Sequence, residues 1–191
     1  MHAARLPRRH APFALILAPV LLVPATARGQ TSVTISADLE TRARAIHESV
    51  ITIDTHDDIS SNFATADSDP GQEEGRQVTL PKMRAGGLDV AFFIVYVGQT
   101  ERTPENYAEA KAEALRKFEA IHRLTDEMYP DEIGLALTPE DVERLHAEGK
   151  LVAAIGIENG YSIGTDLALM EDFHARGARY FGLTHIGHND L

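Results

Sequence analysis

The first side chains that could do chemistry are a histidine and an aspartate two positions apart. His56 and Asp58 come after a β-branched run at residues 50–54, which predicts a strand. Alternate residues of an extended chain point to the same side, so both side chains can reach one ion. An imidazole and a carboxylate suit Zn²⁺ or a similar divalent metal. The alternative without a functional role is that the histidine only ends the strand and that the acids beside it lie in a loop, exposed to solvent.

A second carboxylate and a further histidine follow two later predicted strands. Glu158 ends the apolar run at 151–157, where a carboxylate is costly unless it is paired or bound to metal. A salt bridge to Arg179 is one explanation, but the two carboxylate oxygens can also bridge two ions about 3.5–4 Å apart. His185 follows the strand-like segment at 178–183 and could act as a ligand, a proton carrier or an oxyanion stabiliser.

The other histidines of the chain carry weaker signals. His188 lies one short turn after His185, and its role stays open. Four more lie on predicted amphipathic helices, where a surface or hydrogen-bonded role is the better interpretation: His47, His122, His146 and His174.

Strand-like and helix-like segments alternate along the chain and must position these side chains. The predicted strands are 50–54, 90–97, 151–157 and 178–183, and the predicted helices begin near Ser36, Leu80, Thr103, Thr138 and Asp166. Buried strands separated by helices form a parallel α/β sheet. Active sites in such folds gather at the carboxyl ends of the strands, so we expect the polar residues above to meet at one edge.

The composition excludes several classes of protein. The 191 residues include no Cys, which removes disulfide scaffolds, cysteine-based zinc sites and thiol nucleophiles. A formal net charge of −11 argues against nucleic-acid binding, which needs a basic face. The length suits one domain but is short for a closed eight-stranded barrel, which typically takes about 250 residues.

The first 29 residues have the layout of a secretory signal peptide. Arg5, Arg8 and Arg9 precede an apolar stretch at 11–24, and the small residues at 25–27 resemble a cleavage site. The apolar stretch is too short and too rich in proline for a spanning helix. We therefore expect export to a bacterial periplasm or the exterior, with no stable membrane span after cleavage.

Four stretches of the chain resemble the membrane (renal) dipeptidases, a family of dinuclear zinc peptidases on an α/β barrel. They occur in the family's order and at plausible separations: Ile53–Asp58 (IDTHDD), Leu80–Ala91 (LPKMRAGGLDVA), Ile155–Gly160 (IGIENG) and Gly177–His185 (GARYFGLTH). The family commonly has Gly-Gly-His after its bridging glutamate, whereas this chain has Asn159-Gly160-Tyr161, a difference expected to affect substrate preference.

The resemblance implies the N-terminal half of a TIM-like (β/α)8 metallohydrolase barrel, with parallel strands and active-site residues at their C-terminal ends. His56 and Asp58 would bind one zinc, Glu158 would bridge two, and His185 would stabilise the oxyanion. The complete enzyme would use two Zn²⁺, or similar divalent ions, and a metal-bridging water to hydrolyse a small dipeptide. A homodimer is possible.

The family's remaining ligands lie on later strands, so residues 30–191 are expected to be a partial barrel domain, truncated at the C-terminus. Such a chain alone should hydrolyse dipeptides poorly. Two other interpretations stay open: the chain belongs to a related amidohydrolase acting on a non-peptide amide or lactone, or it is a truncated, non-catalytic remnant of such an enzyme. A periplasmic binding module explains acids and histidines at three strand ends less well.

Overall fold

The computed structural model describes residues 35–72 and 75–191, of which Ser36–Leu191 belong to one compact unit. The predicted signal segment at 1–29 lies outside the described residues. Among the helices of the described part, none is long and apolar enough to cross a membrane.

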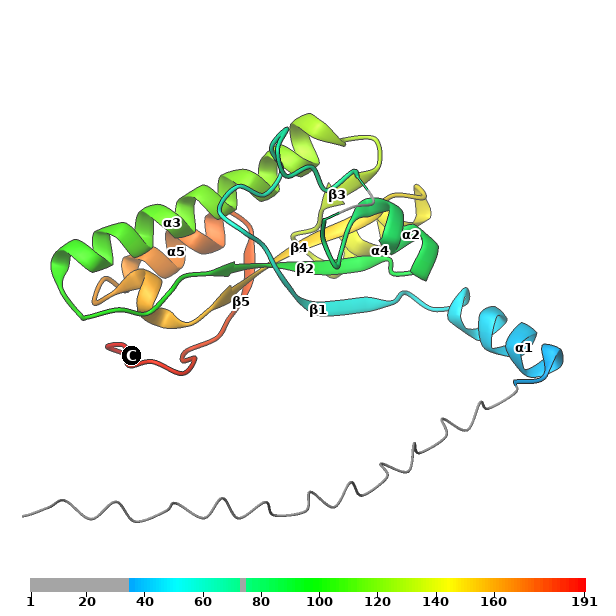
Figure 1. Cartoon of the computed structure of the whole chain (residues 1–191), viewed down its shortest axis with the longest axis horizontal. Helices are drawn as coiled ribbons and strands as arrows, with labels where there is room; N and C mark the ends of the chain where they lie inside the picture. Colours follow the sequence, from blue (N-terminus) through cyan, green and yellow to red (C-terminus); the bar gives the residue numbers. More distant parts are fainter. Residues whose placement is uncertain (1–34, 73–74) are drawn as a thin grey trace, which may run out of the picture. The chain divides into compact units, whose positions relative to one another are not determined.

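The described part of the chain builds one parallel sheet. Its strands are β1 (Ile53–Asp58), β2 (Val90–Tyr96), β3 (Ile133–Leu135), β4 (Leu151–Glu158) and β5 (Ala178–Phe181). Strand β4 pairs with β2 along one edge, while β3 and β5 share its other edge, and β1 lies beyond β2. Because every pairing is parallel, the carboxyl ends of the strands face the same edge of the sheet (Figure 1).

Helices α3 (Pro104–Arg123) and α5 (Ala168–Ala175) cover one face of the sheet and lie side by side (Figure 1). Alternate residues of β2 and β4 join the main hydrophobic core with α3, as the period of two in a strand requires. The rings of Phe118 on α3 and Phe173 on α5 meet at 5.2 Å between centroids.

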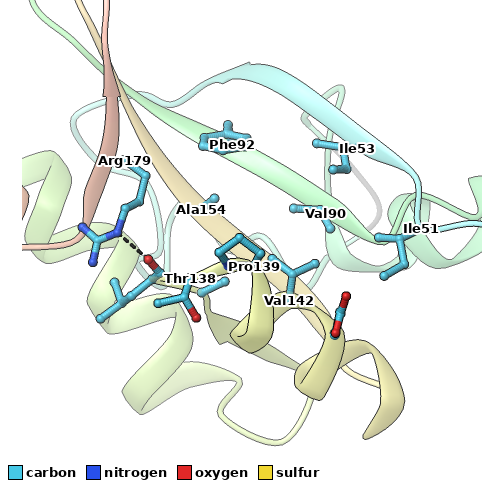
Figure 2. Close-up of a pocket in the computed structure, with 12 residues that line it drawn as sticks. Ile51, Ile53, Val90, Phe92, Thr138, Pro139, Val142, Ala154 and Arg179 are labelled. Atoms are coloured by element: carbon cyan, nitrogen blue, oxygen red, sulfur yellow. Dashed lines mark hydrogen bonds between the residues drawn. The ribbon is translucent and has the colours of Figure 1, made fainter.

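Helix α4 (Pro139–Ala147) packs against the other set of alternating strand residues. Leu145 forms a second, smaller core with Val90 and Val152. An apolar pocket of about 400 Å³ remains on this face (Figure 2), lined among others by Ile53, Phe92, Ala154, Pro139 and Val142. None of His56, Asp58, Glu158 and His185 lines it.

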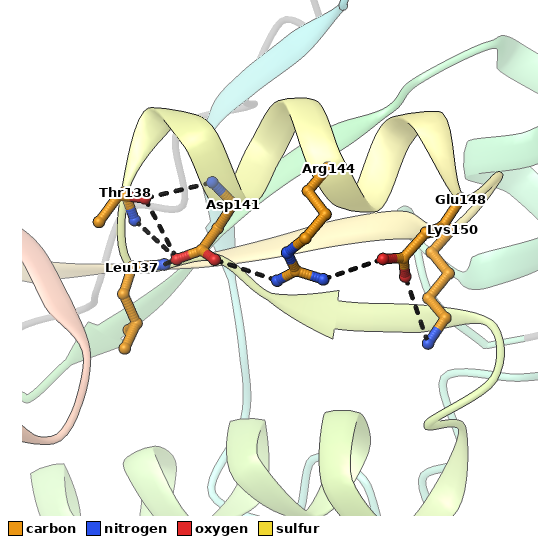
Figure 3. A network of polar contacts seen from close by, with 6 residues as sticks. All are labelled: Leu137, Thr138, Asp141, Arg144, Glu148 and Lys150. Carbon is orange, nitrogen blue, oxygen red and sulfur yellow. Dashed lines mark hydrogen bonds and ion pairs between the residues drawn. The ribbon is translucent and has the colours of Figure 1, made fainter.

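Local hydrogen bonds explain where most helices begin. Helices α1 (Ala37–His47), α2 (Leu80–Gly86), α3 and α4 each follow a Ser or Thr whose hydroxyl accepts the backbone N–H three residues on. In α4 this is a capping box between Thr138 and Asp141. The capping box continues into an exposed chain of ion pairs through Arg144, Glu148 and Lys150 (Figure 3).

The structure differs from the predicted elements in several places, among them the end of the last strand, which lies at Phe181 and not at residue 183. Strand β1 does not stop at residue 54 but runs from Ile53 to Asp58, because the polar residues still pair with β2. Strand β3 was not predicted, since three residues are too short for a periodic signal. The long helix leaves α-helical geometry after Arg123 and continues as a π-helical turn to Met128.

Candidate metal centre

Three of the four sequence-predicted site residues converge at the carboxyl edge of the sheet. One ligand atom from each of His56, Asp58 and Glu158 lies within 4.8 Å of the other two. His56 Nε2 is 3.5 Å from Asp58 Oδ1 and 3.2 Å from Glu158 Oε2. His56 and Asp58 come from β1 and Glu158 from the end of β4, so the cluster spans β2, which lies between these strands.

A bulge in β1 shapes the ligand end of this strand. Asp54 pairs with Ala91, but the next pair joins Asp57 to Phe93, so one extra residue is accommodated between them. Within the bulge, the backbone N–H of His56 donates to Asp54 Oδ1 at 2.9 Å. Bulges commonly re-aim a side chain, and this one lies directly at the histidine of the cluster.

His185 contacts the other oxygen of the same glutamate. Its Nε2 lies 3.0 Å from Glu158 Oε1, whereas Oε2 faces His56. The ring of Tyr96 meets the His185 ring edge to face at 5.5 Å. The segment after His185 is held by Gln99, whose Oε1 accepts the backbone N–H of Gly187 at 3.0 Å. The two oxygens of Glu158 are thus divided between two histidines.

Tyr180 is a site residue that sequence reasoning missed. Its hydroxyl donates to the Thr55 carbonyl oxygen at 3.0 Å and lies 3.4 Å from His56 Nδ1. The ring crosses β4 directly over Gly156, where a Cβ would meet the ring at 2.2 Å. An interior glycine in a strand marks a close approach, so Gly156 was the available signal.

These contacts are compatible with one tautomer of His56 that would leave its Nε2 open to a metal. Because the Tyr180 hydroxyl donates to Thr55, its oxygen is free to accept the Nδ1–H of His56. The Nε2 lone pair then faces the oxygens of Asp58 and Glu158. In this tautomer three acceptor atoms face one another, and one imidazole with two carboxylates is a donor set that zinc accepts. The residues therefore fit a divalent metal.

The surroundings carry an excess of negative charge. Burial raises the pKa of Asp57 to about 7, with Asp54 and Asp58 adding to the shift and Arg76 opposing it. Burial also raises the pKa of Tyr180, and the carboxylates of Glu158 and Asp58 act in the same direction. A bound cation would relieve this repulsion.

The structure also decides between the alternatives left open for other residues. Arg179 does not pair with Glu158: its guanidinium donates to the carbonyl oxygen of Leu137, the dashed line in Figure 2, and also to that of His174. Two of the helical histidines have structural partners, since His47 lies 2.9 Å from the Gly87 carbonyl oxygen and His122 2.8 Å from that of Arg176.

Asn159 and Tyr161 tie neighbouring strand ends together. Tyr161 is fully buried, and its hydroxyl donates to the Glu101 carbonyl oxygen at 2.8 Å. Asn159 adopts a φ of 67° and donates from Nδ2 to the Val97 carbonyl oxygen at 3.0 Å. Both contacts join the end of β4 to the segment after β2.

The chain matches known proteins over most of its length. The family model for membrane dipeptidase (Peptidase family M19) matches residues 40–191. Dipeptidase aclJ of Aspergillus oryzae is 30% identical over 118 residues, covering 60% of this chain and 28% of that protein. Dipeptidase verJ of Clonostachys rogersoniana is 30% identical over 116 residues, covering 58% of this chain and 30% of that protein. The chain therefore spans less than a third of the length of these relatives.

Solved structures show the same fold. The probable dipeptidase PvdM from Pseudomonas aeruginosa superposes with a TM-score of 0.72 at 27% identity, covering 78% of this chain and 38% of that one. A metallo peptidase from Rhodobacter sphaeroides, liganded with a phosphinate mimic of the dipeptide L-Ala-D-Ala, gives a TM-score of 0.56 at 20% identity, covering 69% and 44%.

The expected fold class, a parallel α/β sheet belonging to a TIM-like barrel, is confirmed by the strand pairing and by the likeness to PvdM. The family match runs through all four residues singled out from the sequence, from His56 to His185. The chain belongs to the membrane dipeptidase family, peptidase family M19.

Proposed function

We propose that the protein to which this chain belongs is a metal-dependent dipeptidase and that this chain supplies its first metal ligands. The observation that carries the proposal is the convergence of one ligand atom each from His56, Asp58 and Glu158, all within 4.8 Å of one another, at the carboxyl edge of the sheet. Family membership and the dipeptidase names of the relatives support a dipeptide as the substrate.

His56, Asp58 and Glu158 would hold one Zn²⁺, and the second oxygen of Glu158 would be shared with a second ion. A divalent ion in this position lowers the pKa of a bound water and polarises a carbonyl group. Glu158 is suited to bridging because its two oxygens already face different partners, His56 and His185.

His185 would act on the substrate rather than on the metal. Its side chain is 37% exposed, and Tyr96 supports one side of its ring. Its Nε2, which lies 3.0 Å from Glu158 Oε1 in the structure, would instead donate an N–H to the oxygen of the scissile carbonyl as negative charge develops there.

We also infer that the protein is exported, from the signal-like residues 1–29.

The test measures release of free amino acids from L-Ala-L-Ala and L-Ala-D-Ala by the protein in its full natural length. We expect hydrolysis that stops when a chelator removes the metal and returns with Zn²⁺. Asp58→Asn should lower the rate at least about 100-fold, as expected when a metal ligand is lost. Asp131→Asn, at an exposed turn remote from the cluster, is the matched control.

Three outcomes would contradict the proposal. Hydrolysis that does not depend on a metal would mean that the cluster does not hold a catalytic metal. Activity on a simple amide or a lactone, with none on dipeptides, would show that the substrate is not a dipeptide and that the protein is a related amidohydrolase. Full activity of Asp58→Asn would remove this residue from the site. For this chain by itself we expect hydrolysis of dipeptides to be weak or absent.

A further inference from the structure

One lysine is buried beside the candidate site. Lys117 is only 5% exposed, on a face of α3 that otherwise buries apolar residues such as Ala114, Phe118 and Ile121. Burying an ammonium group is costly unless nearby negative charge compensates. The position of Lys117 therefore needs an explanation other than packing.

The ammonium group of Lys117 reaches towards the end of the sheet that carries the metal ligands. Its Nζ lies 5.7 Å from the centre of the Tyr96 ring, a cation–π distance. Tyr96 pairs with Glu158 in the β-ladder, and its ring also meets that of His185. One aromatic side chain thus contacts both the buried lysine and a histidine of the site.

Three carboxylates act on Lys117. Burial lowers the pKa of Lys117, while the negative charges of Glu113, Asp58 and Glu158 oppose the shift and favour the ammonium form. Glu113 is already engaged, because it accepts hydrogen bonds from the Arg116 guanidinium, at 3.0 Å from Nε, and from the Ser61 hydroxyl. Among the described residues, the ion-pair contacts of Asp58 and Glu158, the two proposed metal ligands, are with histidines and not with a lysine or an arginine.

We propose that Lys117 is a positioning residue of the metal centre: a fixed buried cation that offsets the charge of Asp58 and Glu158 and thereby limits the affinity of the site for a divalent ion. The inference rests on the metal site proposed above. In the metal-free protein the ammonium group stabilises the ligand carboxylates. Once a divalent ion is bound, the same group repels it. Removing the charge should therefore tighten metal binding.

The experiment measures the dissociation constant of Zn²⁺ from the chain by competition with a chromophoric chelator at constant pH. Lys117→Met keeps the length and apolar character of the side chain without its charge. We expect Zn²⁺ to bind at least about 10-fold more tightly to this variant, because a unit positive charge repels a divalent ion across several ångströms of protein. Lys117→Arg keeps the charge and should bind Zn²⁺ as the unaltered chain does.

Two further variants separate this electrostatic role from others. Lys111→Met removes a charge from the same helix at a less buried position and should leave the Zn²⁺ affinity unchanged. Glu113→Gln removes the carboxylate one turn from Lys117 and should also leave the affinity within about twofold, because Glu113 is held by Arg116. If Glu113→Gln instead reproduces the effect of Lys117→Met, the lysine acts through that local pair and the proposal is wrong.

An unchanged or weaker Zn²⁺ affinity in Lys117→Met would overturn the proposal, since a residue with only a packing role cannot tighten metal binding. Lys117→Gln serves as a second neutral variant. If both neutral variants fail to fold with and without Zn²⁺, Lys117 is a packing residue and the proposal also fails. If the unaltered chain does not bind Zn²⁺ at all, the proposed metal site itself is wrong, which is a different result.

Discussion

Two clusters of charged residues in this molecule look alike by composition but differ in how they are built. The cluster on α4 joins Thr138, Asp141, Arg144 and Glu148, all within one helix and its cap, and each acid has a nearby base (Figure 3). The cluster at the strand ends joins His56, Asp58, Glu158 and His185 from three strand ends, and the ion-pair contacts of its acids are with histidines. The first pairs each acid with a base, whereas the second gathers two carboxylates around one imidazole, a set of groups that suits a cation.

The two clusters also differ in burial and in how far apart in sequence their contacting residues lie. Side chains of the α4 cluster are separated by three or four positions, the spacing of neighbours on a helix surface, and exposed pairs of this kind contribute little each. Glu158, by contrast, has a side chain only 17% exposed and has partners about 100 and 27 residues away in sequence. Charge that is half-buried and unbalanced indicates a binding site, and charge that is exposed and balanced indicates a structural role.

The sharpest way to break this comparison is to remove the central glutamate. We expect Glu158→Gln to weaken Zn²⁺ binding by the chain at least about 100-fold, because a neutral amide ligates poorly and both histidines lose their shared partner. Glu148→Gln on α4 is the matched control and should leave Zn²⁺ affinity unchanged. Equal Zn²⁺ affinities of the two variants, measured by chelator competition, would mean that the strand-end cluster is not a metal site.

A smaller effect is expected from the residue behind His56. Tyr180→Phe removes the hydroxyl that orients the imidazole, and we expect about 10-fold weaker Zn²⁺ binding. Tyr129→Phe is a suitable control, because it removes a hydroxyl that donates to Asp69, away from the cluster. Loss of Zn²⁺ affinity in both variants would point to general destabilisation instead of an effect on the ligand.

The helix cluster should respond in stability and not in metal binding. Thr138→Ala removes the hydroxyl that accepts the backbone N–H of Asp141, and loss of such a cap costs about 1 kcal/mol. The unfolding midpoint in urea should fall, while the Zn²⁺ affinity of the folded chain stays the same. A change in Zn²⁺ affinity would show that α4 and the strand ends are coupled.

The smallest expected effect is a pH dependence on α4. The Arg144 guanidinium, followed by the backbone N–H of Leu137, lowers the pKa of Asp141 below its ordinary value of 3.8. A lowered pKa in the folded state contributes stability above the ordinary pKa, and this stability is lost as the pH falls through the folded value. Asp141→Asn should therefore lower the melting temperature at neutral pH, with a difference that shrinks between about pH 5 and about pH 2.

Local signals account for what could be predicted. Hydroxyl caps at Ser36, Thr103 and Thr138 start helices where they were expected, because a cap needs only a backbone N–H three residues away. Gly87, with a φ of 68°, ends α2 at the expected place. The apolar runs became β2 and β4, because strands covered on both faces have few polar positions.

Long-range features could not be predicted with the same certainty. Nothing local indicates that β1 would continue through its polar residues, since that depends on pairing with β2. Tyr180 and Lys117 come from a strand and a helix whose patterns are those of ordinary core elements, and only their contacts with His56 and Tyr96 relate them to the site. Strand β3 was missed because its length allows no periodicity to be recognised.

The amino-acid sequence alone determined the residue types of the site, the alternation of strands and helices, and the family resemblance that the comparisons confirmed. Only the tertiary structure decided that Glu158 turns one oxygen to His56 and the other to His185, that Arg179 bonds elsewhere, and that Lys117 lies buried against Tyr96. The physical reason is the distance along the sequence over which each effect acts. Caps and strand propensities act over a few residues, whereas the meeting of side chains depends on strand order, register and one bulge.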